Sequence, residues 1–279
     1  MKRTNTLSNA VAVAAFAALV LGYAVVAGRT HAAPRAAAAR QQGNEFRWRE
    51  ALAGGKVIEI KGVNGNVEAT PSSSGEVEVV AVKSSRRSNP EDVRIEVVRH
   101  SEGVTICAVY PNVGGRANTC EPGGRGHTNV RNNDTEVNFT VRVPSGVRFN
   151  GRTVNGRVEA NNLTADVEAT TVNGDVEVTT AGLASAKTVN GSITVVMGNA
   201  NWTGEMQFKT VNGSIDVSMP ASLSAEVEAK TLNGEISSDF PLTVQGTFSR
   251  RHLSGTIGGG GRSLQLETVN GSVNIRRAS

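Results

Sequence analysis

A short phrase, Thr-Val-Asn-Gly, returns along the second half of this chain and constrains its fold more than any other feature. Counted from Asn155, its turn position recurs after 18, 17, 22, 21, 21 and 16 residues. One of these copies is degraded to His252-Leu253-Ser254-Gly255, and an outlying copy stands at Val63-Asn64-Gly65. A turn phrase repeated at this spacing, with strand-like segments between the copies, is typical of a stacked-repeat architecture.

The Asn-Gly pair predicts a sharp turn, because Gly adopts positive φ freely and Asn tolerates it better than most residues. In a hairpin the pair would indicate an antiparallel turn. Its recurrence at coil spacing favours instead a corner repeated up a stack, where Asn side chains of successive coils can hydrogen-bond to one another. We therefore predict a structural corner role for Asn64, Asn155, Asn173, Asn190, Asn212, Asn233 and Asn270.

The segments between the corners alternate Val or Ile with polar residues, as in residues 56–60, 76–82 and 174–178. This alternation indicates strands with one buried and one wet face. With 38% hydrophobic residues, 4% aromatic residues and 31 glycines, the composition suits a thin core. We predict an all-β chain, folded as a β-solenoid of about seven coils, with no helix longer than a turn or two.

The N-terminus has the features of an export signal. Lys2 and Arg3 precede an apolar run from Ala10 to Ala27, and Thr30-His31-Ala32 fits a cleavage site. The alternative is an uncleaved anchor, because the run reaches the lower limit for a membrane span. We expect residues 1–32 to be a signal peptide or anchor, 33–45 an Ala-rich linker and 46–279 one solenoid domain. The predicted location is the periplasm, the cell surface or the medium.

The chain has two cysteines, Cys107 and Cys120. In an exported protein this even number favours a disulfide, which would hold down a Gly-rich excursion over residues 110–134. A reactive thiol near His127 is the alternative, although neither cysteine lies in a nucleophile motif.

Residues at equal offsets from the corner Asn would form columns if the coils stack in register. Three positions before it stand Lys187, Lys209, Lys230 and Arg251. On consecutive coils these cations would lie about 5 Å apart, an arrangement that stability alone does not favour. They are our candidate binding site, for an anionic envelope polysaccharide or acidic lipid. The alternative is a solubilised strand face neutralised by Glu226 and Glu228.

The sequence gives little indication of a metal site, a catalytic site or a nucleic-acid-binding site. Four positions after the corner Asn, acidic residues gather in the early coils, where a weak cation site between Glu159 and Glu177 is an alternative to solvated strand positions. The four histidines share no metal-ligand spacing with Cys or a carboxylate, and no serine lies in a nucleophile elbow. We predict no catalytic residue, no metal and no cofactor. The net charge of +4 does not imply nucleic-acid binding.

Three features together resemble the bacterial putative-adhesin β-strand-repeat family, a domain of unknown function. They are Phe46-Arg47-Trp48, the stretch Gly62-Val63-Asn64-Gly65-Asn66-Val67-Glu68-Ala69 and the later Thr-Val-Asn-Gly copies. The resemblance spans about residues 46–279. It implies a β-solenoid-like fold and export or surface exposure, with no catalytic residues to carry over. The Cys107 and Cys120 excursion is not part of the family pattern.

The leading functional hypothesis is an exported, non-enzymatic binding or structural module of the cell envelope. Its partner would be an anionic envelope polymer or another envelope protein, with membrane contact only through an uncleaved N-terminal segment. A polysaccharide lyase or hydrolase is the enzymatic alternative, but Trp48 and Trp202 are the only tryptophans available to stack sugars. An envelope-stress accessory protein is a third reading. We expect the C-terminal strand to be an open edge, protected by Arg276 and Arg277.

Overall fold

The computed structural model describes residues 39–278, apart from 113, 125 and 245–248. The predicted signal peptide or anchor, residues 1–32, and the start of the predicted linker lie outside this range. No helix in the described part is long and apolar enough to cross a membrane. The remainder of the predicted linker is partly ordered, because Arg40–Gln42 forms strand β1 and pairs with the next strand.

The described residues form an all-β structure, as predicted, whose one helical element is the single-turn 3₁₀ helix η1 (Pro90–Asp92). Eleven strands make the first sheet. Their spatial order is β1 (Arg40–Gln42), β2 (Glu45–Glu50), β5 (Val77–Ser84), β8 (Glu136–Val143), β4 (Val67–Pro71), β10 (Val158–Leu163), β12 (Val176–Thr180), β14 (Ile193–Met197), β16 (Ile215–Met219), β22 (Val273–Arg277) and β18 (Ile236–Ser238).

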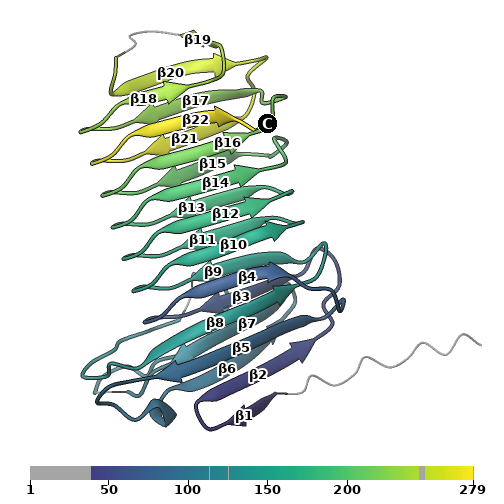
Figure 1. The fold of residues 1–279 in the computed structure, drawn as a ribbon, viewed down its shortest axis with the longest axis vertical. Helices are drawn as coiled ribbons and strands as arrows, with labels where there is room; N and C mark the ends of the chain where they lie inside the picture. Colours follow the sequence, from purple (N-terminus) through teal and green to yellow (C-terminus); the bar gives the residue numbers. More distant parts are fainter. Residues whose placement is uncertain (1–38, 113, 125, 245–248, 279) are drawn as a thin grey trace, which may run out of the picture. The chain divides into compact units, whose positions relative to one another are not determined.

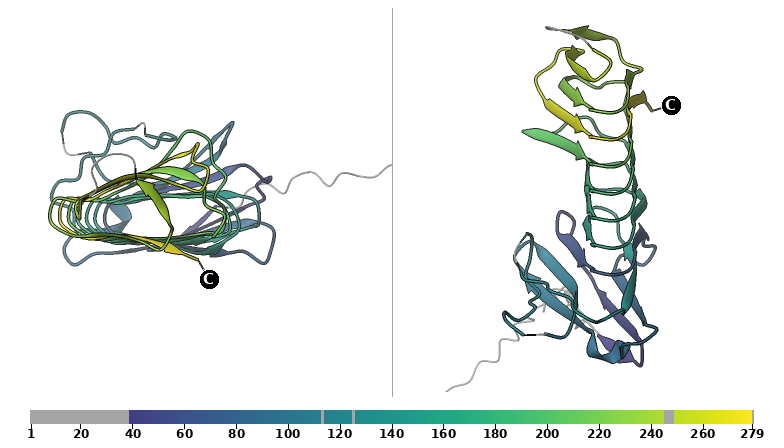
Figure 2. Two further views of the ribbon diagram at one scale, coloured as in Figure 1. Left: turned by 90° about the horizontal axis from the view of Figure 1, so that it is seen from above. Right: turned by 90° about the vertical axis from the view of Figure 1, so that its left-hand side faces the viewer.

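The second sheet also has eleven strands. Their order is β19 (Leu242–Val244), β20 (His252–Ile257), β17 (Ala225–Lys230), β21 (Ser263–Glu267), β15 (Glu205–Lys209), β13 (Ala184–Lys187), β11 (Val167–Thr170), β9 (Arg148–Arg152), β3 (Val57–Lys61), β7 (Gly103–Val109) and β6 (Arg94–His100). Seen from above, the strands of the regular coils overlay in two facing layers (Figure 2).

The regular coils each contribute one strand to each sheet, and neighbouring coils pair in parallel. Their short strands follow the predicted alternation: Val176 and Val178 of β12 are buried, whereas Glu177 between them is exposed. In-register pairing places Val176 beside Ile193 and Val178 beside Val195, so buried side chains of equal offset stack through the coils. The result is a thin core between two sheets, built mainly from Val, Ile, Ala and Leu.

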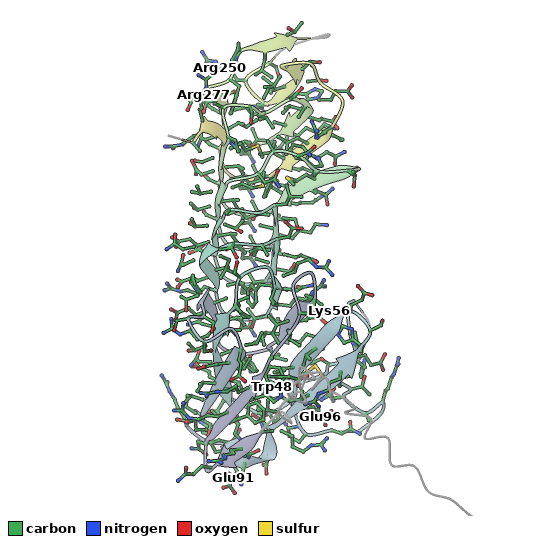
Figure 3. The ribbon with its side chains drawn as sticks, turned by 90° about the vertical axis from the view of Figure 1, so that its right-hand side faces the viewer. Trp48, Lys56, Glu91, Glu96, Arg250 and Arg277 are labelled. Atoms are coloured by element: carbon green, nitrogen blue, oxygen red, sulfur yellow. A yellow bond between two sulfur atoms is a disulfide. The ribbon has the colours of Figure 1, made fainter. Side chains whose placement is uncertain are left out.

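The N-terminal part departs from this regular pattern. Strands β2, β5 and β8 pair antiparallel, and β6 and β7 form an antiparallel hairpin. Large side chains fill this end of the core, among them Trp48, Tyr110 and Phe139. After β7, residues 110–135 leave the sheets before β8 begins. A disulfide joins Cys107 and Cys120, drawn in yellow in Figure 3, and attaches this excursion to β7.

The order of coils in space differs from their order in the sequence. Strand β21 lies between β15 and β17, and β22 lies between β16 and β18. Figure 1 shows these two yellow strands between green ones. The chain therefore forms the coil of β17 and β18 and continues outward through β19 and β20. It then returns, and β21 and β22 occupy the position between that coil and the coil of β15 and β16.

This return corrects two expectations. The C-terminal strand β22 is not an open edge, because both its neighbours pair with it; β18 and β19 are the terminal strands at that end. The guanidinium of Arg277, a residue labelled in Figure 3, instead lies 5.3 Å from the ring centre of Phe240. The degraded phrase His252-Leu253-Ser254-Gly255 is not a turn, because it lies within β20 and pairs antiparallel with β17.

Candidate functional site

The asparagines that the sequence predicts to form corners lie next to one another in the stack. Each Asn forms an isolated parallel bridge to the Asn of the neighbouring coil. Side-chain amides continue this contact, with Nδ2-to-Oδ1 distances of 2.7 to 2.8 Å. The donor and acceptor pairs are Asn155 to Asn64, Asn173 to Asn155, Asn190 to Asn173, Asn212 to Asn190, Asn270 to Asn212 and Asn233 to Asn270.

The hydrogen bonds predicted between these asparagine side chains are present, but the positive φ predicted for the asparagines is not. Among the described non-glycine residues, positive φ occurs only at Asn132 and Asn162, neither of which belongs to the phrase. Gly174 needs to be glycine on two counts: its φ is +158°, and a Cβ would lie 2.1 Å from the carbonyl oxygen of Gly156 in the neighbouring coil. At the glycine of the phrase, the backbones of neighbouring coils thus lie closer together than a Cβ atom would allow.

The threonine of the phrase, for which the sequence suggested no role, completes the corner. Its side chain is buried, and its Oγ1 donates to the glycine carbonyl of the neighbouring coil at 2.7 to 2.9 Å. The donors are Thr153, Thr171, Thr188, Thr210, Thr268 and Thr231. A buried hydroxyl needs such an acceptor, so Thr and Gly of adjacent coils act together.

The predicted basic column is interrupted. Lys187 pairs with Lys209 as expected, but the next residue in register is Glu267, followed by Lys230. The C-terminal coil introduces this glutamate when it inserts between β15 and β17. Arg251 lies in the turn before β20, and His252 takes the position opposite Lys230.

Carboxylates accompany the cations of this column. Nζ of Lys209 lies 2.6 Å from Oε2 of Glu267, and Nζ of Lys230 lies 2.5 Å from Oε1 of Glu228. The hydrogen bond from Lys230 also lowers the pKa of the Glu228 carboxyl. The outer face of the second sheet therefore does not carry a stripe of uncompensated positive charge along this column.

The same face carries a groove of about 810 Å³ beside this column. Its floor is formed by outward-facing residues of β3, β9, β11 and β13, which pair in register as Glu59, Asn150, Glu168 and Ser185. The excursion forms one wall through residues 122–124, together with His100 and Glu102. The segment with Trp202 and Thr203 forms another.

Glu59 is the most constrained charged residue of the groove, being only 2% exposed. Its Oε2 accepts from the Thr105 hydroxyl at 2.8 Å and from the Gly123 backbone N–H at 2.9 Å. Its Oε1 has no hydrogen-bond partner among the described residues, although Nε of Arg152 lies 3.5 Å away. A buried carboxylate needs such neighbours to offset its desolvation.

Further contacts hold the excursion against β3 and β7. Nζ of Lys61 donates to the Glu121 carbonyl at 2.5 Å, close to the disulfide. Burial lowers the pKa of the Lys61 ammonium, and the negative charge of Glu59 opposes that shift. Nε2 of His100 lies 3.1 Å from Oγ1 of Thr105, so the imidazole joins the same network.

Arg152 connects Glu59 to the open part of the groove. Its Nη2 lies 2.7 Å from Oε1 of Glu168, and its Nε donates to Oδ1 of Asn150 at 3.1 Å. Asn150 in turn donates to Oε2 of Glu168 at 3.1 Å. The groove floor is therefore a preorganised hydrogen-bonded surface suited to recognising polar or charged groups.

Sequence reasoning missed this groove. Glu59 has the same alternating pattern as many solvated glutamates, and only the excursion, which folds back over β3, removes it from water. The two cysteines were the available signal, because a disulfide at Cys107 ties the following residues to the strand beside β3. The part of the chain that the structure describes has no group of three or more His, Cys, Asp or Glu residues able to hold a metal ion.

Among solved structures, the fold is similar to a putative cell adhesion protein from Clostridium sporogenes, with 10% identity, 83% of this chain and 99% of that chain covered, and a TM-score of 0.44. It is also similar to a putative adhesin from Bacteroides fragilis, with 14% identity, coverage of 85% and 98%, and a TM-score of 0.32. No curated protein matches the chain.

The family model described as Toastrack DUF4097 matches residues 129–276, more than half of the 279 residues. The matched part contains the coils from β9 onward, whereas Glu59, Asn64, His100 and the disulfide precede it. The resemblance based on the Thr-Val-Asn-Gly phrases is confirmed by this match: the chain belongs to the Toastrack DUF4097 family.

Proposed function

We propose that this protein is an exported, non-enzymatic binding module of the bacterial cell envelope, and that the groove on its second sheet is the binding site. The observation that carries the proposal is a groove of about 810 Å³ whose floor and walls are already held in place by hydrogen bonds and a disulfide. Ligand sites are commonly preformed concavities of this size.

Export is supported by the disulfide and by the leader-like N-terminus. Disulfides persist in oxidising compartments outside the cytosol, and the bond between Cys107 and Cys120 attaches one wall of the groove to β7. The wall of the groove therefore depends on an oxidising environment.

A binding role is supported over hydrolysis by how the reactive groups are used. The Thr105 hydroxyl lies beside His100 but is fully buried and donates to Glu59, so it does not face a substrate. Glu168 accepts from Arg152 and Asn150. Both carboxylates serve as acceptors within the floor, whereas a glycosidase needs one carboxyl free to donate a proton.

The regular coils supply a rigid support for this site. We infer that the seven Asn-Gly phrases at Asn64, Asn155, Asn173, Asn190, Asn212, Asn270 and Asn233 mark the corners of seven stacked coils, in this spatial order. The Asn side chains hydrogen-bond to one another along the column, and Asn64 also donates to the Thr135 carbonyl at 3.5 Å. Their part in the function is to hold the sheets in register.

The partner that we propose is another envelope protein. The cations at Lys209 and Lys230 are paired with carboxylates, and the adjacent groove carries several acidic side chains, an environment that repels an anionic polymer. Binding to an anionic envelope polymer at Lys187 and Lys209 is the other outcome that the experiment below can return.

Site-directed photo-crosslinking in the native cell tests the proposal. A photoreactive amino acid would replace Thr203 on the groove wall, or Thr194 on the exposed face of the first sheet as a matched control. We expect a discrete protein adduct in the envelope fraction for position 203 and none for position 194. A protein confined to the cytosol, or polysaccharide turnover by the purified chain, would contradict the proposal.

A further inference from the structure

The groove has a strong charge imbalance. Among the residues that the structure describes, five acidic side chains line it, compared with one arginine, Arg148. The acidic residues are Glu59, Glu102, Asp166, Glu168 and Glu205. Nη2 of Arg148 lies 3.7 Å from Oε2 of Glu102, so this cation compensates one exposed carboxylate at the rim. The floor and the opposite wall remain acidic.

Arg152 and Lys61 reduce the negative charge beneath the floor without cancelling it. Arg152 lies between Glu59 and Glu168 and contacts both carboxylates. Lys61 lies on the same strand as Glu59, two residues further along. Asp166 and Glu205 line the groove away from this cluster, and the Asp166 carboxylate accepts from the Leu183 backbone N–H.

Glu59 gives this acidic surface one specific feature. Glu59 lines the groove, and only 2% of the residue is exposed to solvent. Its Oε1 receives no hydrogen bond from a described residue. An unsatisfied carboxylate oxygen in a poorly hydrated environment favours a charged donor more strongly than an exposed carboxylate does. The excursion and the Trp202 segment, as low-dielectric walls, also concentrate the field of the acidic groups within the groove.

We propose that the groove binds a positively charged segment of a partner protein, with a lysine or arginine side chain directed toward Glu59 and Glu168. This inference rests on the proposed binding function and names the chemistry of the partner. Asp166 and Glu205 receive further cations of the segment. Asn150, which lies in register between Glu59 and Glu168, and Ser185, which lies beside Glu168 on the next strand, provide neutral hydrogen-bonding groups to its backbone.

Fluorescence anisotropy with labelled heptalysine tests the inference on the purified protein. We expect salt-sensitive binding, and no binding of labelled heptaglutamate or heptaserine. The groove variants are Glu59→Gln, which retains an acceptor for Thr105 and Gly123, and Glu205→Gln, which alters an exposed side chain. Combined, they should weaken heptalysine binding at least tenfold. Glu177→Gln, on the exposed face of the first sheet, is the matched control and should bind like wild type.

Equal affinities of the groove variants and the Glu177→Gln control would overturn the inference, as would tight binding of heptaglutamate. Because Glu205 is exposed, that single variant decides the question even if Glu59→Gln does not fold. Failure of the inference is separable from failure of the proposed function. A crosslinked protein at position 203 with no heptalysine preference rejects only the cationic partner, whereas heptalysine binding without an envelope adduct rejects the envelope role.

Discussion

The regular coils from β9 to β16 and the N-terminal part from β1 to β8 use the same two sheets in different ways. In the coils, short parallel strands place the Thr, Asn and Gly of each repeated phrase beside those of the neighbouring coil. In the N-terminal part, longer strands, larger core residues and a disulfide-held excursion interrupt that regularity. The groove forms where the two parts meet, which indicates that repetition provides the support and irregularity provides the site.

The largest expected effect comes from changing the close approach at a corner. In Gly174→Ala, the new Cβ would meet the Gly156 carbonyl oxygen at 2.1 Å, and the backbone of two coils must separate. We expect a loss of about 4 kcal/mol in the free energy of unfolding, measured by urea denaturation. Gly204→Ala is the control, because its φ is +77° but no atom lies within 4 Å, and it should cost only about 1 kcal/mol. Equal losses of stability in the two variants would show that the backbone φ, rather than the contact with the Gly156 carbonyl, requires glycine at position 174.

Removing the disulfide should affect the other part of the molecule. Replacing Cys107 and Cys120 by Ser opens a loop with a sequence separation of 13, for which unfolded-state entropy predicts a loss of about 3 kcal/mol. We expect faster proteolysis within residues 110–134 and unchanged hydrogen exchange in β12 and β14. Equal loss of protection in both regions would show that the coils depend on the N-terminal part.

A smaller effect is expected from one corner hydroxyl. Thr188→Val keeps the shape of the buried side chain but removes the donor to the Gly174 carbonyl, now 2.9 Å away. The expected cost is about 1–2 kcal/mol in thermal unfolding. Thr194→Val, on the exposed face of β14, is the control and should change stability by less than about 0.5 kcal/mol. If Thr188→Val left the stability unchanged, the hydrogen bond from Thr188 to the Gly174 carbonyl would not contribute to holding the coils together.

The smallest and most local effect concerns Asp134, which holds the loop after β5. Its carboxylate accepts from the backbone N–H groups of Arg87 and Ser88, and hydrogen bonds centred on Ser88 lower its pKa from 3.8 to about 2. Because the folded-state pKa is depressed, its contribution is present above pH ~4 and is lost as pH falls toward 2. NMR titration of this carboxyl should show the shift, and Asp134→Asn should remove the pH dependence of the loop amides between pH 4 and 2. An ordinary titration would contradict the hydrogen-bonded arrangement.

The all-β class and the family could be predicted from the sequence, because the alternation of Val with Glu and the repeated phrase are local signals. The spatial order of coils could not, since every coil offers the same corner and Asn270 fits between Asn212 and Asn233 as well as beyond them. This ambiguity also produced the mistaken basic column, which Glu267 interrupts. The groove depends on the excursion covering Glu59, a contact between residues distant in sequence for which no periodic signal exists.

The inserted C-terminal coil has a consequence for how the molecule is completed during synthesis. A chain that emerges N-terminus first can stack its coils in order only as far as β16. The β17 and β18 coil then either waits or docks on β15 and β16 through the same corner groups, and in the second case it must be displaced when β21 and β22 arrive. The two sheets are therefore completed only when β21 and β22 insert between strands that were synthesised earlier, after translation has reached residue 277.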